Sequence, residues 1–228
     1  MGASLDYVFD SQIKILGDFN ADWDKDAIKN EPMFYKSHID FARKHGGPIT
    51  QEFLAHLPDG WDDCIIDSRS HMLMNGWFPA IPGYHHDDVP RPKAPEGSHF
   101  LSAGQPDYDN PAYYSEHLMG LVNAHICPTD FIIGKCRMAA VPEGELIYRQ
   151  WHEELFRLLA AGEVDIYKAE SGKYIYFDWR TFHQAVPAVS SGWRWFIRLT
   201  RNSDTVKNPQ NEIRKQVQVY LEFPMEGW

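Results

Sequence analysis

The sequence lacks several features that would place it in a familiar class of protein. It has only three cysteines, Cys64, Cys127 and Cys136, and no C-x-x-C pair, so neither a disulfide framework nor a zinc ribbon is indicated. No run of about 18 apolar residues is present, and we expect no segment to span a membrane. The amino terminus has neither a basic start nor a long apolar stretch, and we therefore expect a cytoplasmic protein.

Positive charge is also scarce. Lys and Arg number 22 against 32 Asp and Glu, which gives a net charge of −10 at pH 7. A protein that binds nucleic acid needs a basic surface to displace the counterions of the phosphates. We therefore expect a small molecule, an amino acid or a peptide as the partner and rank nucleic acid well below them. The oligomeric state stays open.

Aromatic residues and turn formers, in contrast, are abundant. The chain has 8 Trp, 11 Tyr and 13 Phe, together with 15 Pro and 16 Gly. Aromatic side chains favour strands and often line pockets, whereas Pro and Gly indicate many turns. At 228 residues, the chain can bury a sizeable core within a single domain. This composition predicts a mainly β fold with flanking helices.

The pattern of apolar residues divides the chain at about residue 60. We predict a helical region over about 1–60, packed on a β-rich core over about 61–228. We expect one helix at 31–43 and a shorter one that begins at Thr50 as its N-cap. A third helix is expected at 148–159, within the β-rich part, with His152 exposed on it. The expected strands are 64–66, 72–78, 83–87, 118–126, 131–139, 174–178, 193–201 and 216–222.

One long segment, 89–114, shows no periodicity. It is rich in Pro, Gly, Asp and Ser, and it directly follows the sequence His85-His86-Asp87. Long irregular loops in compact domains are usually lids, binding loops or disordered. We interpret this segment as a lid beside any site that the preceding residues form.

His85-His86-Asp87 is the most informative motif. In an extended strand, side chains two residues apart point the same way, so His85 and Asp87 can reach one metal while His86 faces away. Two imidazoles and one carboxylate are the ligand set that holds ferrous iron on one face and leaves the opposite positions open. The frame shifted by one residue, His86 and Asp88, would turn the opposite face of the strand to the metal.

The second half of the chain supplies another histidine and two arginines. His183 lies in GKYIYFDWRTFHQAVPA, a few residues after the predicted strand 174–178. In the later strand WRWFIRLTR, the side chains of Arg194, Arg198 and Thr200 share one face. Two arginines on a buried face need an anion, and a dicarboxylate would accept two parallel hydrogen bonds from a guanidinium. The alternative is a solvent-exposed face on which both arginines are surface charges.

The order of these residues resembles the Fe(II)/2-oxoglutarate-dependent dioxygenase superfamily. Its pattern is His-x-Asp/Glu, a distant second His, and an Arg on the following strand. The phrase FDWRTFHQAVPA followed by GWRWFIR is most similar to the phytanoyl-CoA hydroxylase-like and taurine dioxygenase-like branches. The resemblance covers roughly residues 72–201. It implies a double-stranded β-helix, which is a cupin-like jelly roll, and it implies Fe(II), 2-oxoglutarate and O2 as cofactor and cosubstrates.

The resemblance also implies the metal ligands. His85, Asp87 and His183 would hold the iron and form the catalytic centre. An aromatic residue precedes the first ligand in many members of the superfamily, and Tyr84 stands at that place here. This match favours the frame that begins at His85 over the shifted one.

The arginine that binds the distal carboxylate of 2-oxoglutarate is less sharply defined. Arg198-Leu199-Thr200 is similar to the Arg-x-Ser pairing of the superfamily, in which a hydroxyl assists the carboxylate contact. Arg194 lies closer to His183 in the sequence and is the alternative. We therefore carry Arg198, Arg194 and Thr200 forward as candidate cosubstrate contacts.

The activity that the resemblance implies is hydroxylation, coupled to the conversion of 2-oxoglutarate to succinate and carbon dioxide. Halogenating members of the superfamily replace the carboxylate ligand with a small residue, so the presence of Asp87 argues against halogenation. One alternative is a cupin-like metal-binding or sensing protein without 2-oxoglutarate turnover. Another is a metal-dependent isomerase or oxygenase that needs no 2-oxoglutarate, which would leave the arginine pair unexplained.

Overall fold

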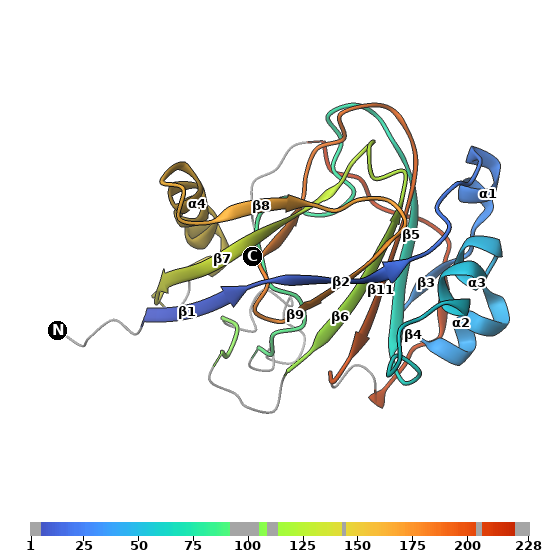
Figure 1. Cartoon of the computed structure of the whole chain (residues 1–228), viewed down its shortest axis with the longest axis horizontal. Helices are drawn as coiled ribbons and strands as arrows, with labels where there is room; N and C mark the ends of the chain where they lie inside the picture. Colours follow the sequence, from blue (N-terminus) through green and yellow to red (C-terminus); the bar gives the residue numbers. More distant parts are fainter. Residues whose placement is uncertain (1–5, 92–104, 109–113, 143–144, 204–206, 222–228) are drawn as a thin grey trace.

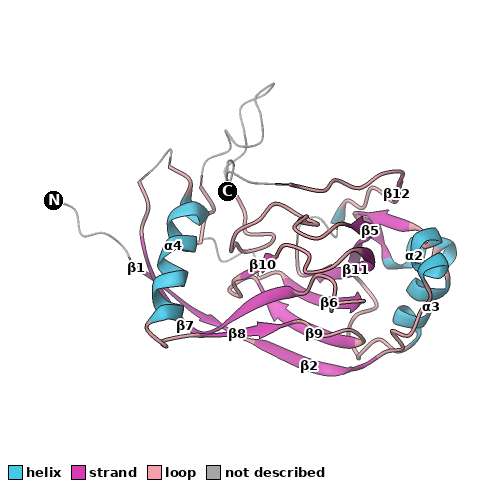
Figure 2. Ribbon diagram, turned by 90° about the horizontal axis from the view of Figure 1, so that it is seen from above, coloured by secondary structure: helices cyan, strands magenta, loops and turns pink. Residues whose placement is uncertain are grey.

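The computed structural model describes residues 6–91, 105–108, 114–142, 145–203 and 207–221. In this part of the chain, strands make up 38% of the residues and helices 19%, so the fold is mainly β, as predicted. The helices lie at opposite ends of the sheets, with α4 at one end and α1, α2 and α3 at the other (Figures 1 and 2). No described helix has the length and apolar character needed to cross a membrane.

Two antiparallel sheets dominate the fold. The larger has six strands, in the order β2 (Ile13–Asp18), β9 (Lys173–Asp178), β6 (Glu116–Val122), β11 (Gly192–Arg201), β5 (Ile65–Leu73) and β4 (Ser37–His38). The smaller has β1 (Asp6–Ser11), β7 (Thr129–Ala139) and β10 (His183–Ala185), with β8 (Asp165–Lys168) also paired to β7. A third sheet joins β12 (Glu212–Arg214) to β3 (Met33–Tyr35).

The first sixty residues are less helical than predicted. Strand β1 joins the smaller sheet and β2 joins the larger one, so this stretch of chain runs along both sheets. Its helices are short: α1 (Lys25–Asn30), α2 (Ile39–His45) and α3 (Pro48–Ala55). Their buried side chains pack against Trp195, Ile197 and Leu199 of β11 in one apolar cluster. The helices therefore cover one face of the larger sheet, while the strands extend the two sheets.

Local backbone geometry explains why the predicted helix 31–43 is shorter than expected. Lys36 has a positive φ of 43°, a conformation that an α-helix does not allow, and only α2 follows it. The next helix begins at Pro48, so Thr50 lies inside it and is not the N-cap. The carboxylate of Glu31 instead accepts the backbone N–H groups of Ile49 and Thr50, at 3.1 and 2.9 Å. A residue distant in the sequence therefore caps α3.

Several strand predictions need correction. The strands predicted at 64–66 and 72–78 both overlap a single strand, β5, which runs from Ile65 to Leu73, so that Cys64 and residues 74–78 lie outside it. Residues 83–87 form only one isolated bridge, between His85 and His183, because Gly83 and Asp88 on either side have positive φ values of 111° and 52°. The predicted strand 216–222 is likewise reduced, among its described residues, to a bridge at Tyr220.

The strand β11 and the helix α4 agree with the sequence. On β11, the apolar side chains face the core cluster and Arg194 and Arg198 face the opposite side, as the alternation predicts. The predicted helix 148–159 is α4 (Ile147–Ala160), which contacts β7. His152 on this helix is half-buried and not exposed, because its Nδ1 accepts the backbone N–H of Tyr84 at 3.1 Å.

Candidate metal centre

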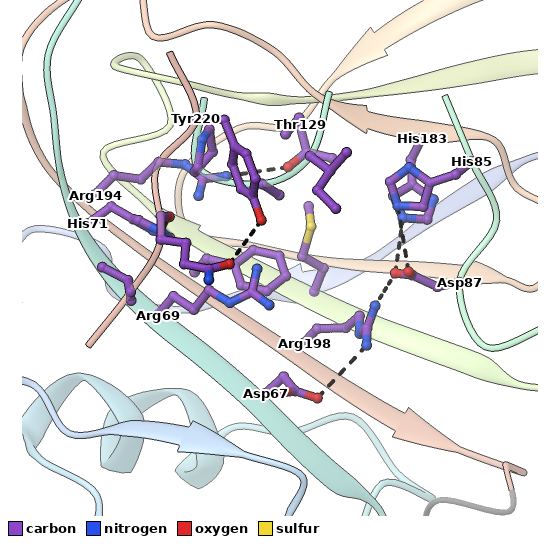
Figure 3. Close-up of a pocket in the computed structure, with 18 of the residues that line it drawn as sticks. Asp67, Arg69, His71, His85, Asp87, Thr129, His183, Arg194, Arg198 and Tyr220 are labelled. Carbon is purple, nitrogen blue, oxygen red and sulfur yellow. Dashed lines mark hydrogen bonds and ion pairs between the residues drawn. The ribbon is translucent and has the colours of Figure 1, made fainter. Parts of the chain in front are cut away.

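Three side chains that can ligate a metal converge between the sheets. One ligand atom from each of His85, Asp87 and His183 lies within 4.8 Å of the other two. The Nε2 of His183 is 3.0 Å from one carboxylate oxygen of Asp87, and the Nε2 of His85 is 3.6 Å from the other (Figure 3). Within the described ranges, no other group of three such residues meets in this way.

Backbone pairing sets this convergence. The N–H of His85 donates to the carbonyl of His183 at 3.1 Å, and the N–H of His183 donates back at 3.2 Å. This reciprocal pair fixes the two histidines opposite each other, with ring centroids 4.7 Å apart. Asp87 follows two residues after His85 on the same side, and the left-handed backbone at Asp88 ends the extended segment there.

A second layer of hydrogen bonds orients the two imidazoles. The Nδ1 of His85 lies 2.9 Å from the carbonyl of Gly83, and the Nδ1 of His183 lies 3.0 Å from the carbonyl of Thr181. A carbonyl can only accept, so each Nδ1 carries a hydrogen, and each Nε2 is the ring nitrogen that faces Asp87 and the centre. Metal-bound histidines usually donate their second ring nitrogen in this way. The residues present therefore fit a divalent transition-metal ion.

The shifted frame of His86 and Asp88 does not converge. The ring of His86 packs on Phe182, with centroids 3.8 Å apart, and its Nδ1 lies 2.9 Å from the hydroxyl of Tyr108. Burial lowers the pKa of His86 well below its ordinary value, so the ring is neutral. Asp88 instead lies 3.8 Å from Arg198. The structure thus brings His85 and Asp87 together, as in the frame that the sequence favours, and directs the ring of His86 into the apolar core.

A cavity of about 480 Å³ opens from the triad. One wall comes from β5 and β11 of the larger sheet, and the opposite wall from β7 and β10 of the smaller sheet. Residues 79–81 and the segment 214–220, which precedes the carboxyl terminus, complete the lining. Cavities of this size hold small-molecule ligands. The site therefore consists of a metal-type ligand set in one part of a cavity that is large enough to admit an organic molecule.

Arg194 lies in this cavity without an acidic partner. Its side chain is buried at 3% exposure, its Nε donates to the carbonyl of Cys127 at 2.6 Å, and its Nη2 donates to the hydroxyl of Thr129 at 3.4 Å. No ion pair joins it to a carboxylate of the described chain. Thr129 pairs with Ala185 on β10, two residues from His183, which corresponds to about 7 Å along the strand.

Arg198, in contrast, is already surrounded by carboxylates. It forms an ion pair with Asp87, and its Nη2 lies 3.8 Å from Asp88 and 3.9 Å from Asp67. Burial alone would raise the pKa of Asp87, but Arg198 and His183 outweigh burial and hold that pKa well below its ordinary value. Asp87 is therefore ionised, as a metal ligand must be.

Thr200 does not reach the cavity. Its hydroxyl lies 3.0 Å from the Nδ1 of His117, and both side chains are buried. It shares a face with Arg194, as predicted, but six residues separate the two along β11, or about 20 Å. The hydroxyl beside Arg194 belongs to Thr129, on the other sheet, which the sequence analysis did not identify.

Other cavity residues were also missed. The polar side chains Asp67, Arg69 and His71 alternate along β5 and face the cavity, and this alternation was the available signal. Most of the segment 89–114, interpreted as a lid, lies outside the described residues. Its described part includes Tyr108, whose hydroxyl is 2.8 Å from that of Tyr148 on α4.

Comparison with known proteins identifies no relative of this chain, so a functional assignment depends on the geometry of the site. No protein-family model, curated protein or solved structure matches this chain. Two features define the site: three convergent ligands and a buried arginine without a counter-ion.

His71 allows a test of the cavity's electrostatics. Its Nε2 lies 3.2 Å from the carbonyl of Gln218, and burial, followed by Arg194 and Arg69, lowers its pKa to about 3. Because the unfolded chain takes up this proton near pH 6.5, protonation opposes folding below that pH. We expect the wild type to lose about 1.4 kcal/mol per pH unit relative to His71→Gln between pH 6 and 4. Urea unfolding at each pH measures this difference, and parallel profiles would contradict it.

Proposed function

We propose that this chain is an Fe(II)/2-oxoglutarate-dependent oxygenase that hydroxylates a small molecule, an amino acid or a peptide. One observation carries the proposal: the cavity has three convergent metal-type ligands at one part and the buried, acid-free Arg194 at another. A metal site alone would not call for this arginine. A chelating diacid accounts for both features, since it can meet the metal at one end and a guanidinium at the other.

The proposal extends to the fold. A cavity lined by two antiparallel sheets is compatible with a double-stranded β-helix of the cupin-like jelly-roll type. In this interpretation β5 and β11 form one wall and β7 and β10 the other.

Each residue then has a role in binding or orientation. His85, Asp87 and His183 would hold the Fe(II), and their low exposure keeps bulk water away from it. Arg194 would bind the distal carboxylate of 2-oxoglutarate, and the hydroxyl of Thr129 beside it adds a neutral contact. The iron and 2-oxoglutarate, when bound, supply the oxidising chemistry, whereas the protein supplies placement.

Arg198 acts on the ligand set and not on the cosubstrate. It pairs with Asp87 and so keeps this carboxylate ionised and fixed in orientation. Because its guanidinium already faces three carboxylates, it has little capacity for a fourth. We therefore assign the distal carboxylate of 2-oxoglutarate to Arg194.

Succinate release tests the proposed function. With Fe(II), 2-oxoglutarate, ascorbate and air, the purified chain should form succinate slowly even without a substrate. Arg194→Gln should raise the 2-oxoglutarate concentration needed for half-maximal succinate formation by about tenfold or more, because a charged, two-pronged contact is lost. Arg137→Gln is the matched control, because this side chain is 76% exposed and pairs with Asp6 outside the cavity.

Two results would contradict the proposal. One is that the wild type forms no succinate under these conditions. The other is that Arg194→Gln and Arg137→Gln bind 2-oxoglutarate equally well. Metal binding without succinate would support the cupin-like binding or sensing protein instead.

A further inference from the structure

A second arginine in the cavity also lacks an acidic partner. Arg69 lies on β5, opposite Phe196 of β11, and its guanidinium points into the cavity (Figure 3). No hydrogen bond or ion pair of this guanidinium is found within the described part of the chain, and no dashed line reaches it in Figure 3. Asp67 and Asp87 favour its charged form from a distance, but neither pairs with it, and a partly buried guanidinium without a paired anion is unfavourable. Its position is therefore suited to an anion that arrives with a ligand.

The neighbouring carboxylates are committed to other arginines. Asp67, two residues before Arg69 on the same face, accepts from Arg214 at 2.9 Å and lies 3.9 Å from Arg198. Asp87 pairs with Arg198 and belongs to the proposed ligand set. Neither acid forms an ion pair with Arg69. The protein thus provides counter-charges for two of these arginines and leaves Arg69 and Arg194 without one.

The lining of the cavity is positive overall, although the chain is acidic. Four arginines face two aspartates among the described lining residues, which include neither Lys nor Glu, whereas the whole chain has a net charge of −10. His71 adds no charge near neutral pH, because burial holds its pKa at about 3. A divalent metal and a 2-oxoglutarate dianion would cancel each other. Asp88, outside the lining, also faces Arg198 at 3.8 Å, so one positive charge would remain in excess, and the cavity would attract a further anion.

We propose that Arg69 binds an oxyanion of the substrate, a carboxylate, sulfonate or phosphate, and that the substrate is accordingly a small organic acid. This inference rests on the proposed function in one respect, because it assigns Arg194 to 2-oxoglutarate. The guanidinium fork matches the oxygens of such a group. Arg69 is half-buried whereas Arg194 is fully buried, so Arg69 is the more accessible of the two to a molecule that enters after the cosubstrate.

The surroundings of Arg69 suit the remainder of such a molecule. The side chains of Gln216, Gln218 and Tyr220 line the cavity and offer neutral hydrogen-bonding groups. Pro79 and Ile81 add apolar surface on the same lining. An acid with a short apolar body can therefore place its oxyanion on Arg69 and still have its carbon chain inside the cavity.

The test is a binding measurement that needs neither iron nor oxygen. Hexanoate, hexane-1-sulfonate, hexyl phosphate and the neutral hexanamide are titrated into the full metal-free chain by ligand-observed NMR, with and without excess 2-oxoglutarate. At least one acid should bind about tenfold more tightly than hexanamide, and the best one identifies the oxyanion. Arg69→Gln should weaken that acid about tenfold and leave hexanamide unaffected, whereas Arg137→Gln should change neither.

Arg69→Lys separates charge from geometry. It keeps the positive charge but loses the fork, so its affinity for the acid should fall between those of the wild type and Arg69→Gln. Thermal melting of each variant establishes that it is folded. Equal losses in Arg69→Lys and Arg69→Gln would still support the anion contact and would identify it as two-pronged.

The inference would be overturned in any of three ways. The first is that none of the acids binds. The second is that the acids bind no more tightly than hexanamide, and the third is that Arg69→Gln weakens their binding no more than Arg137→Gln does. Failure of the proposed function is a separate result. If the chain forms no succinate but binds an acid through Arg69, the anion site stands and the proposed oxygenase function fails. If it forms succinate but binds no acid, the proposed function stands and the anion site fails.

Discussion

Replacement of Asp87 by alanine is expected to abolish iron-dependent succinate formation and to weaken metal binding by more than about 100-fold. Even residues that only support metal ligands typically contribute tenfold to 100-fold in affinity, and Asp87 would be a ligand itself. Its carboxylate lies between the Nε2 atoms of His85 and His183, at 3.6 and 3.0 Å. Without it, two imidazoles remain, and the ligand set has no negative charge to offset the cation.

The neighbouring aspartate provides the control. Asp88→Ala removes an acid that also lies near Arg198, at 3.8 Å, but that is not part of the convergent group. Titration with Co(II), followed by its absorption spectrum, should show metal binding in Asp88→Ala close to that of the wild type and none in Asp87→Ala. The reverse outcome, with metal retained in Asp87→Ala and lost in Asp88→Ala, would establish the shifted frame that begins at His86.

The features that sequence alone predicted are those that depend on local periodicity. Side chains alternate along any strand, so the shared side of His85 and Asp87 and the two faces of β11 followed from residue order. The helix α4 followed from its apolar stripe in the same way. Period and facing direction require no knowledge of which strands pair, and these predictions agreed with the structure.

The features that sequence did not predict depend on long-range pairing. Thr129 of β7 reaches Arg194 of β11 only because the two sheets face each other across the cavity, although 65 residues separate the two in the sequence. Arg69 enters the cavity because β5 pairs with β11 over its full length. Thr200 shows the converse: its face was predicted, but its distance along β11 places it on His117. No local sequence pattern specifies the register between strands, which decides the neighbours of a residue across a sheet or a cavity.

Backbone conformations contrary to local preference account for other differences. Lys36 and Asp88 both adopt positive φ, which non-glycine residues seldom do. Lys36 interrupts the helix predicted at 31–43, and Asp88 bounds the segment in which only a bridge at His85 forms in place of the predicted strand. Strand β1 was missed for another reason. It exposes Val8 at 65%, so its apolar residues do not mark one buried face cleanly.

Arg198→Ala should lower the free energy of unfolding of the metal-free protein by about 3–5 kcal/mol, which is the usual result when one partner of a buried ion pair is removed. Asp67, Asp87 and Asp88 all lie near its guanidinium, and burial raises the pKa of Asp88 already in the wild type. Without Arg198 the three carboxylates would repel one another. Urea unfolding measures the loss, and Arg137→Ala, an exposed pair, should cost no more than about 1 kcal/mol.

A divalent metal should recover part of this loss, and this recovery tests the link between Arg198 and the ligand set. In the wild type, a metal at Asp87 must share this carboxylate with Arg198, whereas in Arg198→Ala the metal becomes its principal cation. Saturation with Mn(II) should therefore stabilise Arg198→Ala by more than it stabilises the wild type, each by an amount set by its affinity for the folded state. Equal stabilisation of the two proteins would show that Asp87 is not shared, and that Arg198 contributes to the fold independently of the metal.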